Sequence, residues 1–188
     1  KDLEFSYLKW TIITISSSIF SIIFMSFWGK FSDNYGTLKT MKITGILIPI
    51  IPFLWLLSPL LINTPIILFI YLFFVESLSG AIWAGFNLAA GNFTYDAVTR
   101  QRIAICSTYF NILGGVGIAI GAMLGGFISS LNFTFLGLKS ILLIFLLSGI
   151  LRLIIYVVMI KKIKEVREVK EFNLKDNTEE HLKNLSFK

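Results

Sequence analysis

Five long apolar runs dominate the pattern of hydrophobic and polar positions along the chain. Each has about 20 residues or more, which is the length of helix needed to cross roughly 30 Å of hydrocarbon. Lipid offers the backbone no hydrogen-bond partners, so each run is predicted to be a helix. The pattern therefore predicts an all-α, polytopic membrane helix bundle with five transmembrane helices, at residues 8–28, 41–61, 66–90, 103–130 and 138–160.

Basic residues are divided unequally between the two sides of these spans. Thirteen of them lie in the first and third connections and in the C-terminal tail, whereas only Lys1, Lys9 and Lys139 lie on the other side. Lys and Arg favour the cytoplasmic side of short loops. We therefore expect a cytoplasmic tail and an external Lys1. Pro49 and Pro52 are expected to kink the second span without ending it.

Composition supports a membrane protein and excludes several other classes. The chain of 188 residues is 55% hydrophobic and 15% charged, with a mean hydropathy of +0.79, whereas soluble domains carry about 25% charged residues. A single cysteine, Cys106, excludes a disulfide scaffold. The basic residues behind the net charge of +6 lie mainly between and after the apolar spans, as in a membrane protein, so we expect no nucleic-acid partner. An apolar run begins within ten residues of Lys1, which suggests the C-terminal part of a longer protein.

The first cytoplasmic connection contains Gly29, Asp33, Gly36 and Lys39 in the pattern Gly-x-x-x-Asp-x-x-Gly followed by a base. The glycines permit a tight turn. The carboxylate of Asp33 could cap the N-terminus of the span that begins near Arg102, where helix amides are unpaired. An ordinary polar turn is the alternative interpretation.

This connection resembles the signature loop of the major facilitator superfamily, although Asn34, Thr37 and Leu38 stand where basic residues are usual. The resemblance implies that the five spans are helices 8 to 12 of a twelve-helix permease, with helix 7 and the N-terminal half as missing partners. Residues 1–163 would then form a partial C-terminal transmembrane domain. Residues 164–188 would form a charged cytoplasmic tail, and a helix continuing from the last span into it would make Lys161 and Glu165 neighbours.

A second region strengthens the resemblance. Asp96, Arg100 and Arg102 resemble the family's Asp-then-Arg loop, and they precede a glycine-rich span. Gly117, Gly121 and Gly125 recur every four residues there, so one helix face would allow close approach of another backbone. The family packs this helix between its two halves, but static packing would need the same glycines. The stretch from Trp83 to Asn87 is similar to one in prokaryotic permeases, which implies a prokaryotic cytoplasmic membrane.

Two charged residues lie well inside spans, where ionisable groups are functional candidates. Glu76 is ten residues beyond Ile66, or about 15 Å, which places it near the membrane midplane. At helical spacing, Gly80, Trp83 and Asn87 share its face. We predict that Glu76 binds a coupling proton or a cationic group of the substrate, with Trp83 as an apolar wall and Asn87 orienting the ligand. The alternative for Glu76 is a structural hydrogen bond to another span.

Arg152, the other intramembrane charge, lies about 21 Å beyond Leu138 and is expected to extend to the cytoplasmic headgroups, with pairing to an acid on another span as the alternative.

No pattern for catalysis is present in the sequence. The sole histidine, His181, lies in the tail, and neither Gly-x-Ser-x-Gly nor His-Glu-x-x-His occurs. We therefore expect no enzyme activity, no metal site and no cofactor. The expected function is that of a fragment of a secondary active transporter that moves a small solute by alternating access, with a proton as a candidate coupling ion. A non-transporting receptor or assembly protein on the same fold is the alternative.

Overall fold

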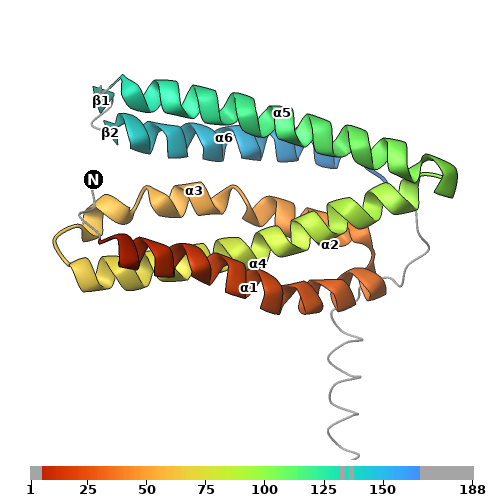
Figure 1. Cartoon of the computed structure of the whole chain (residues 1–188), viewed down its shortest axis with the longest axis horizontal. Coiled ribbons are helices and arrows are strands. Elements are labelled where there is room, and N and C mark those ends of the chain that lie inside the picture. The colour runs from red at the N-terminus through yellow and green to blue at the C-terminus, as the bar shows by residue number, and fades with distance from the viewer. Residues whose placement is uncertain (1–5, 132–133, 136–137, 166–188) are drawn as a thin grey trace, which may run out of the picture.

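The computed structural model describes residues 6–131, 134–135 and 138–165. Its helices run almost parallel or antiparallel to one another (Figure 1). The elements in chain order are α1 (Tyr7–Tyr35), α2 (Thr37–Leu47), α3 (Ile50–Trp55), the 3-10 helix η1 (Ser58–Leu61), α4 (Pro65–Ala97), the 3-10 helix η2 (Arg100–Arg102), α5 (Ile103–Ser130), β1 (Thr134–Phe135), β2 (Leu138–Lys139) and α6 (Ser140–Ile160).

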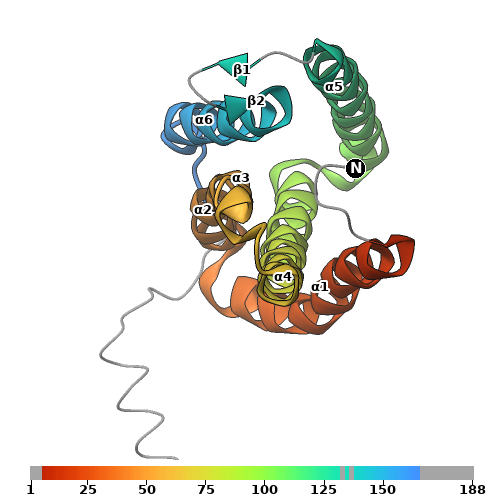
Figure 2. The ribbon, with the colours of Figure 1, turned by 90° about the vertical axis from the view of Figure 1, so that its left-hand side faces the viewer.

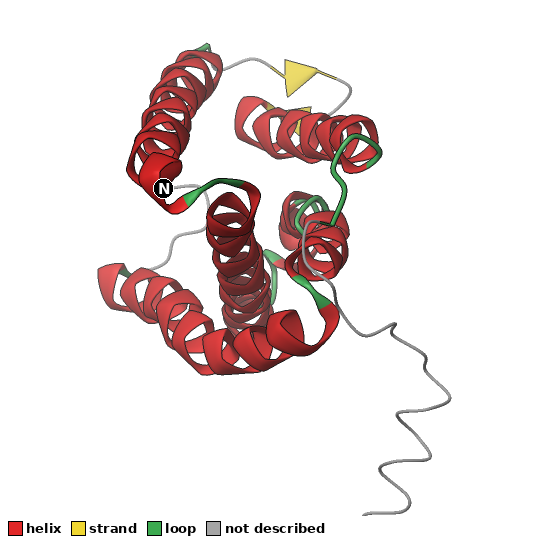
Figure 3. Ribbon diagram, turned by 90° about the vertical axis from the view of Figure 1, so that its right-hand side faces the viewer, coloured by secondary structure: helices red, strands yellow, loops and turns green. Residues whose placement is uncertain are grey.

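The described residues contain five helical segments that are long and apolar enough to cross a membrane. The prediction of an all-α membrane bundle with five spans is therefore confirmed. One small exception lies between α5 and α6, where two strands of two residues pair antiparallel (Figure 3). Because Leu138 and Lys139 take part in this pairing, the last helix begins at Ser140 rather than at Leu138.

The connection between the first two spans is much shorter than the sequence suggested. Helix α1 continues to Tyr35 and α2 begins at Thr37, so only Gly36 separates them. Gly36 has a φ of 95°, a conformation that costs glycine little and other residues more. Polar residues such as Asp33 stay helical because a helix satisfies its own backbone groups in water as it does in lipid. Helix α4 likewise continues past Asp96 to Ala97.

The second span is kinked at Pro49 without being ended there, as predicted, because Ile48 and Pro49 keep helical backbone angles and Thr37–Trp55 forms one span. Helix α2 ends at Leu47 and α3 begins at Ile50, with a turn at Ile48 and Pro49 between them. A proline lacks the N–H that would continue the helical hydrogen bonds. The regular part of this span ends at Trp55, before the predicted end at Leu61, and a turn leads into η1.

The closest helix packing in the described chain joins α1 to α4. A Cβ atom at Gly80 would overlap the backbone carbonyl of Ser17, so the two helices need glycine at this crossing. The indole N–H of Trp28 donates a 2.8 Å hydrogen bond to the carbonyl oxygen of Ala81. Figure 2 shows α4 between α1 and the α2–α3 pair, with α5 and α6 on the side opposite α1. These contacts fix the rotation of α4, which carries the predicted site.

We predict that Gly80→Ala lowers the thermal unfolding temperature of the purified protein in detergent. The added methyl group forces α1 and α4 apart, and overpacking of this kind costs about 1–3 kcal/mol. Gly91→Ala on the same helix is the matched control, because nothing lies within 4 Å of a Cβ at Gly91. Equal unfolding temperatures for the two variants would contradict the packing described here.

Candidate functional site

Glu76 lies eleven residues beyond the first residue of α4, which is about 16 Å along the helix. Its side chain is half-buried. The Oε1 atom accepts a 3.2 Å hydrogen bond from the indole Nε1 of Trp55, the last residue of α3. The carboxylate therefore has a polar partner on another helix, as the structural alternative for Glu76 anticipated.

Trp55 connects this carboxylate to two further helices. Its ring stacks on Trp10 of α1, with centroids 6.3 Å apart and an interplanar angle of 2°. On α6, Phe145 also stacks with Trp55, at 5.2 Å and 3°. The hydroxyl of Tyr71, on α4, donates a 2.8 Å hydrogen bond to the carbonyl oxygen of Leu54. Trp55 thus links the hydrogen bond of Glu76 to packing contacts with α1 and α6 as well as to α3.

The three residues predicted to share the Glu76 face have different surroundings. Gly80 is buried against α1, so it cannot line a solute pathway in this conformation. Trp83 packs edge-on against Phe86, with ring centroids 5.9 Å apart, and lies beside α6. Asn87 is exposed. Their common helix face does not give them a common site because α4 meets a different neighbour at each turn.

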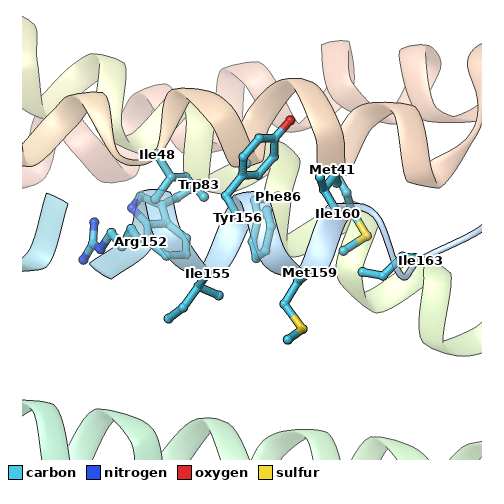
Figure 4. Close-up of a pocket in the computed structure, with 11 residues that line it drawn as sticks. Met41, Ile48, Trp83, Phe86, Arg152, Ile155, Tyr156, Met159, Ile160 and Ile163 are labelled. Atoms are coloured by element: carbon cyan, nitrogen blue, oxygen red, sulfur yellow. The ribbon is translucent and has the colours of Figure 1, made fainter. Parts of the chain in front are cut away.

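Arg152 does not extend towards the C-terminal end of α6, so the expectation that it reaches headgroups at that end was wrong. Figure 4 shows its guanidinium group pointing away from Ile160 and Ile163. The guanidinium carbon lies 5.5 Å from the ring centroid of Trp83, which is a cation–π contact. An arginine at the centre of a span costs about 2.5–3.5 kcal/mol, and a desolvated cation–π contact returns about 2 kcal/mol. Among the described residues, no carboxylate forms an ion pair with Arg152.

A pocket of about 210 Å³ adjoins this arginine, between α2, α4 and α6 (Figure 4). Its walls are mostly apolar and include Phe86, Ile155 and Met159. The sequence analysis did not anticipate the pocket, because the residues that form it lie on three helices far apart in the chain.

Just beyond the end of α6, Glu165 caps the N-terminus of α2. Its carboxylate accepts a 2.9 Å hydrogen bond from the backbone N–H of Leu38 and a 3.2 Å hydrogen bond from the Thr37 hydroxyl. The predicted helical pairing of Lys161 with Glu165 was wrong, because α6 ends at Ile160. Capping explains the difference: an anionic side chain at a helix N-terminus satisfies unpaired amides and the positive end of the helix dipole. The rest of the predicted tail, from residue 166, lies outside the described residues.

The other predicted gating residues are less closely associated. Asp33 is exposed and makes no hydrogen bond to the first turn of α5 in the described part of the chain, so the predicted contact is not made here. The amine of Lys39 lies 6.0 Å from the ring centroid of Tyr35. The remaining predicted positions are Gly29 within α1, the half-buried Asp96 near the end of α4, and the exposed Arg100 and Arg102 of η2.

The glycine face of α5 has no close neighbour in the described part of the chain. Nothing lies within 4 Å of a Cβ built at Gly117, Gly121 or Gly125. No α5 residue is buried. The close backbone approach that these glycines suggested is therefore not made by the described helices.

Comparison with known proteins gives one match. The family model described as Major Facilitator Superfamily matches residues 1–186. No curated protein and no solved structure matches the chain.

We predict that Glu165→Ala speeds hydrogen exchange at the amide of Leu38 by about fivefold, because loss of a capping side chain costs about 1 kcal/mol. Hydrogen–deuterium exchange with mass spectrometry of the peptide that contains Leu38 measures this effect. Lys164→Ala is the control, since Lys164 is the exposed neighbour in sequence. Unchanged exchange in the Glu165→Ala protein would rule out the cap.

Proposed function

The chain belongs to the major facilitator superfamily, and from this premise we propose that it is part of a secondary transporter that moves a small solute by alternating access. Members of that family are transporters rather than enzymes, and the multi-pass helices fit a membrane transporter. The family match gives no support to the alternative of a receptor or assembly protein. The proposed location is a prokaryotic cytoplasmic membrane, with the C-terminus in the cytoplasm.

The proposed partner of this chain is an N-terminal half that supplies the other side of the solute pathway. Rocking of two halves about a site near the midplane is the usual basis of alternating access. The open glycine face of α5, around Gly117, Gly121 and Gly125, supports this proposal because its small residues would let a helix of the other half approach closely. In this arrangement α1 to α6 supply helices 8 to 12.

The proposed coupling group is Glu76, and the observation that carries this proposal is its hydrogen bond from Trp55 at mid-span. An ionised carboxylate makes a stronger hydrogen bond than a neutral one. Uptake of a proton, or binding of a cationic group of the solute, would therefore weaken the hold on Trp55. Because that ring stacks between Trp10 and Phe145, the change would be transmitted to α1 and α6. Asn87, exposed on α4, is the proposed ligand contact nearer the cytoplasm.

The proposed cytoplasmic gate is centred on the start of α2. The Glu165 cap and a 3.0 Å hydrogen bond from the Tyr156 hydroxyl to the carbonyl oxygen of Lys42 hold α2 against the end of α6. Breaking these contacts would free α2 to move about Gly36. Charged residues near the ends of α1, α2 and α4 and in η2 complete the proposed gate: Asp33, Lys39, Asp96, Arg100 and Arg102.

We predict that Glu76→Gln in the complete transporter removes the pH dependence of solute uptake, because the glutamine side chain does not titrate over the pH range of the measurement. Uptake by intact cells or proteoliposomes across a range of pH measures this effect. Trp55→Phe is the matched variant, since it removes the hydrogen bond but keeps both the acid and an aromatic ring. We expect it to alter the rate while the pH dependence remains. If uptake by the Glu76→Gln protein kept the pH dependence of the unmodified transporter, Glu76 would have only a structural role.

We predict the orientation from two single-cysteine variants in a Cys106→Ser background. Asn63 and Asn34 are exposed at opposite ends of the bundle. A membrane-impermeant maleimide should label the Asn63→Cys protein in intact cells, but the Asn34→Cys protein only after lysis. The reverse pattern would place the C-terminus outside the cell.

A further inference from the structure

We propose that the pocket between α2, α4 and α6 binds a small apolar carboxylate whose anionic group pairs with Arg152. The pocket has a volume of about 210 Å³, and three helices contribute its walls. This site is distinct from Glu76, and its occupancy does not depend on whether Glu76 couples transport to protons. The proposal rests on the charge at one end of the pocket, on the size of the pocket and on the direction of the arginine.

The charge favours a singly charged anion. Arg152 is half-buried and makes its cation–π contact with Trp83, but it has no ion pair with a carboxylate in the described ranges. It is also the one charged side chain among the described residues that line the pocket. A planar guanidinium matches a carboxylate through two parallel hydrogen bonds. A phosphate with two charges would leave its second charge without a partner among these walls.

The size favours a short chain or a single ring. A dry apolar cavity of about 150 Å³ holds benzene, so a pocket of about 210 Å³ has room for a ring or a short alkyl chain. The two acyl chains of a phospholipid would not fit. The side chains around that space, such as Ile155, Met159 and Phe86, would contact the apolar part of the ligand.

The direction of Arg152 argues against a lipid headgroup. The guanidinium group lies at the end of the pocket away from Ile160 and Ile163, which are near the cytoplasmic end of α6 (Figure 4). A lipid of the cytoplasmic leaflet would place its headgroup at that cytoplasmic end and its chains towards the arginine. A small carboxylate that enters with its anion foremost has the opposite orientation to such a lipid, and its anionic group then lies beside Arg152.

Bound ligand would also hold α2 against α6. The ring of Tyr156 on α6 lies 3.0 Å from a Cβ built at Gly45 of α2, and both residues line the pocket. A carboxylate that fills the space between these helices and neutralises Arg152 should therefore raise the thermal stability of the protein, as any ligand specific for the folded state does.

The test uses bromohexanoate as the probe and bromohexanol as its neutral counterpart, with the full-length protein in phosphatidylcholine nanodiscs. Bromine quenches tryptophan fluorescence at close range, and Trp83 lines the pocket. We expect saturable quenching by bromohexanoate and about tenfold weaker binding of bromohexanol, because the charged hydrogen bonds are lost. Arg152→Gln should reduce bromohexanoate binding to the level of bromohexanol. Arg152→Lys should retain part of it, which separates loss of charge from loss of fold.

Lys161→Gln is the matched control, because it removes an exposed cation just beyond the end of α6. We expect it to bind bromohexanoate as the unmodified protein does. Equal bromohexanoate binding by the Arg152→Gln and unmodified proteins would overturn the proposal. Loss of binding when phosphatidylglycerol replaces phosphatidylcholine would also overturn it, since the pocket would then be occupied by an anionic lipid.

Discussion

The contact between α1 and α4 sets the position of the functional groups that α4 carries in this membrane domain. Gly80 lets the two backbones meet at Ser17, and the indole of Trp28 binds the carbonyl oxygen of Ala81 one residue further along. Together these contacts fix both the depth and the rotation of α4. With that rotation, Glu76 faces Trp55 of α3 and Trp83 faces Arg152 of α6. A small rotation of α4 would separate both pairs.

The two intramembrane charges are accommodated in different ways. The indole N–H of Trp55 donates a hydrogen bond to the carboxylate of Glu76, and the positive end of that N–H dipole stabilises the negative charge. Arg152 has the face of an aromatic ring, which stabilises a cation but cannot accept several N–H groups. The acid is therefore suited to change its protonation within a defined contact, whereas the arginine is suited to receive an anion. Both interactions involve a tryptophan, whose large ring also packs between helices.

Much of the fold could be predicted from the sequence, because bilayer thickness sets the length and composition of a span. The five spans follow from this constraint alone. The connections could not be predicted as well, since polar residues such as Asp33 and Asp96 can either end a helix or continue it into water. The depth of Glu76 follows from the helical rise. The hydrogen-bond partner of Glu76 could not be predicted, because the kink at Pro49 and the packing around Gly80 determine where Trp55 lies. Glu165 was predicted to pair along a helix, and only the end of α6 at Ile160 makes it available to cap α2.

We propose that the carboxyl group of Glu76 exchanges a proton while it accepts the hydrogen bond from Trp55. Infrared difference spectroscopy of the reconstituted protein between acidic and neutral pH detects such a change in protonation. We expect a carboxyl band that disappears in the Glu76→Gln protein and shifts in the Trp55→Phe protein. Identical difference spectra for the unmodified and Glu76→Gln proteins would contradict it.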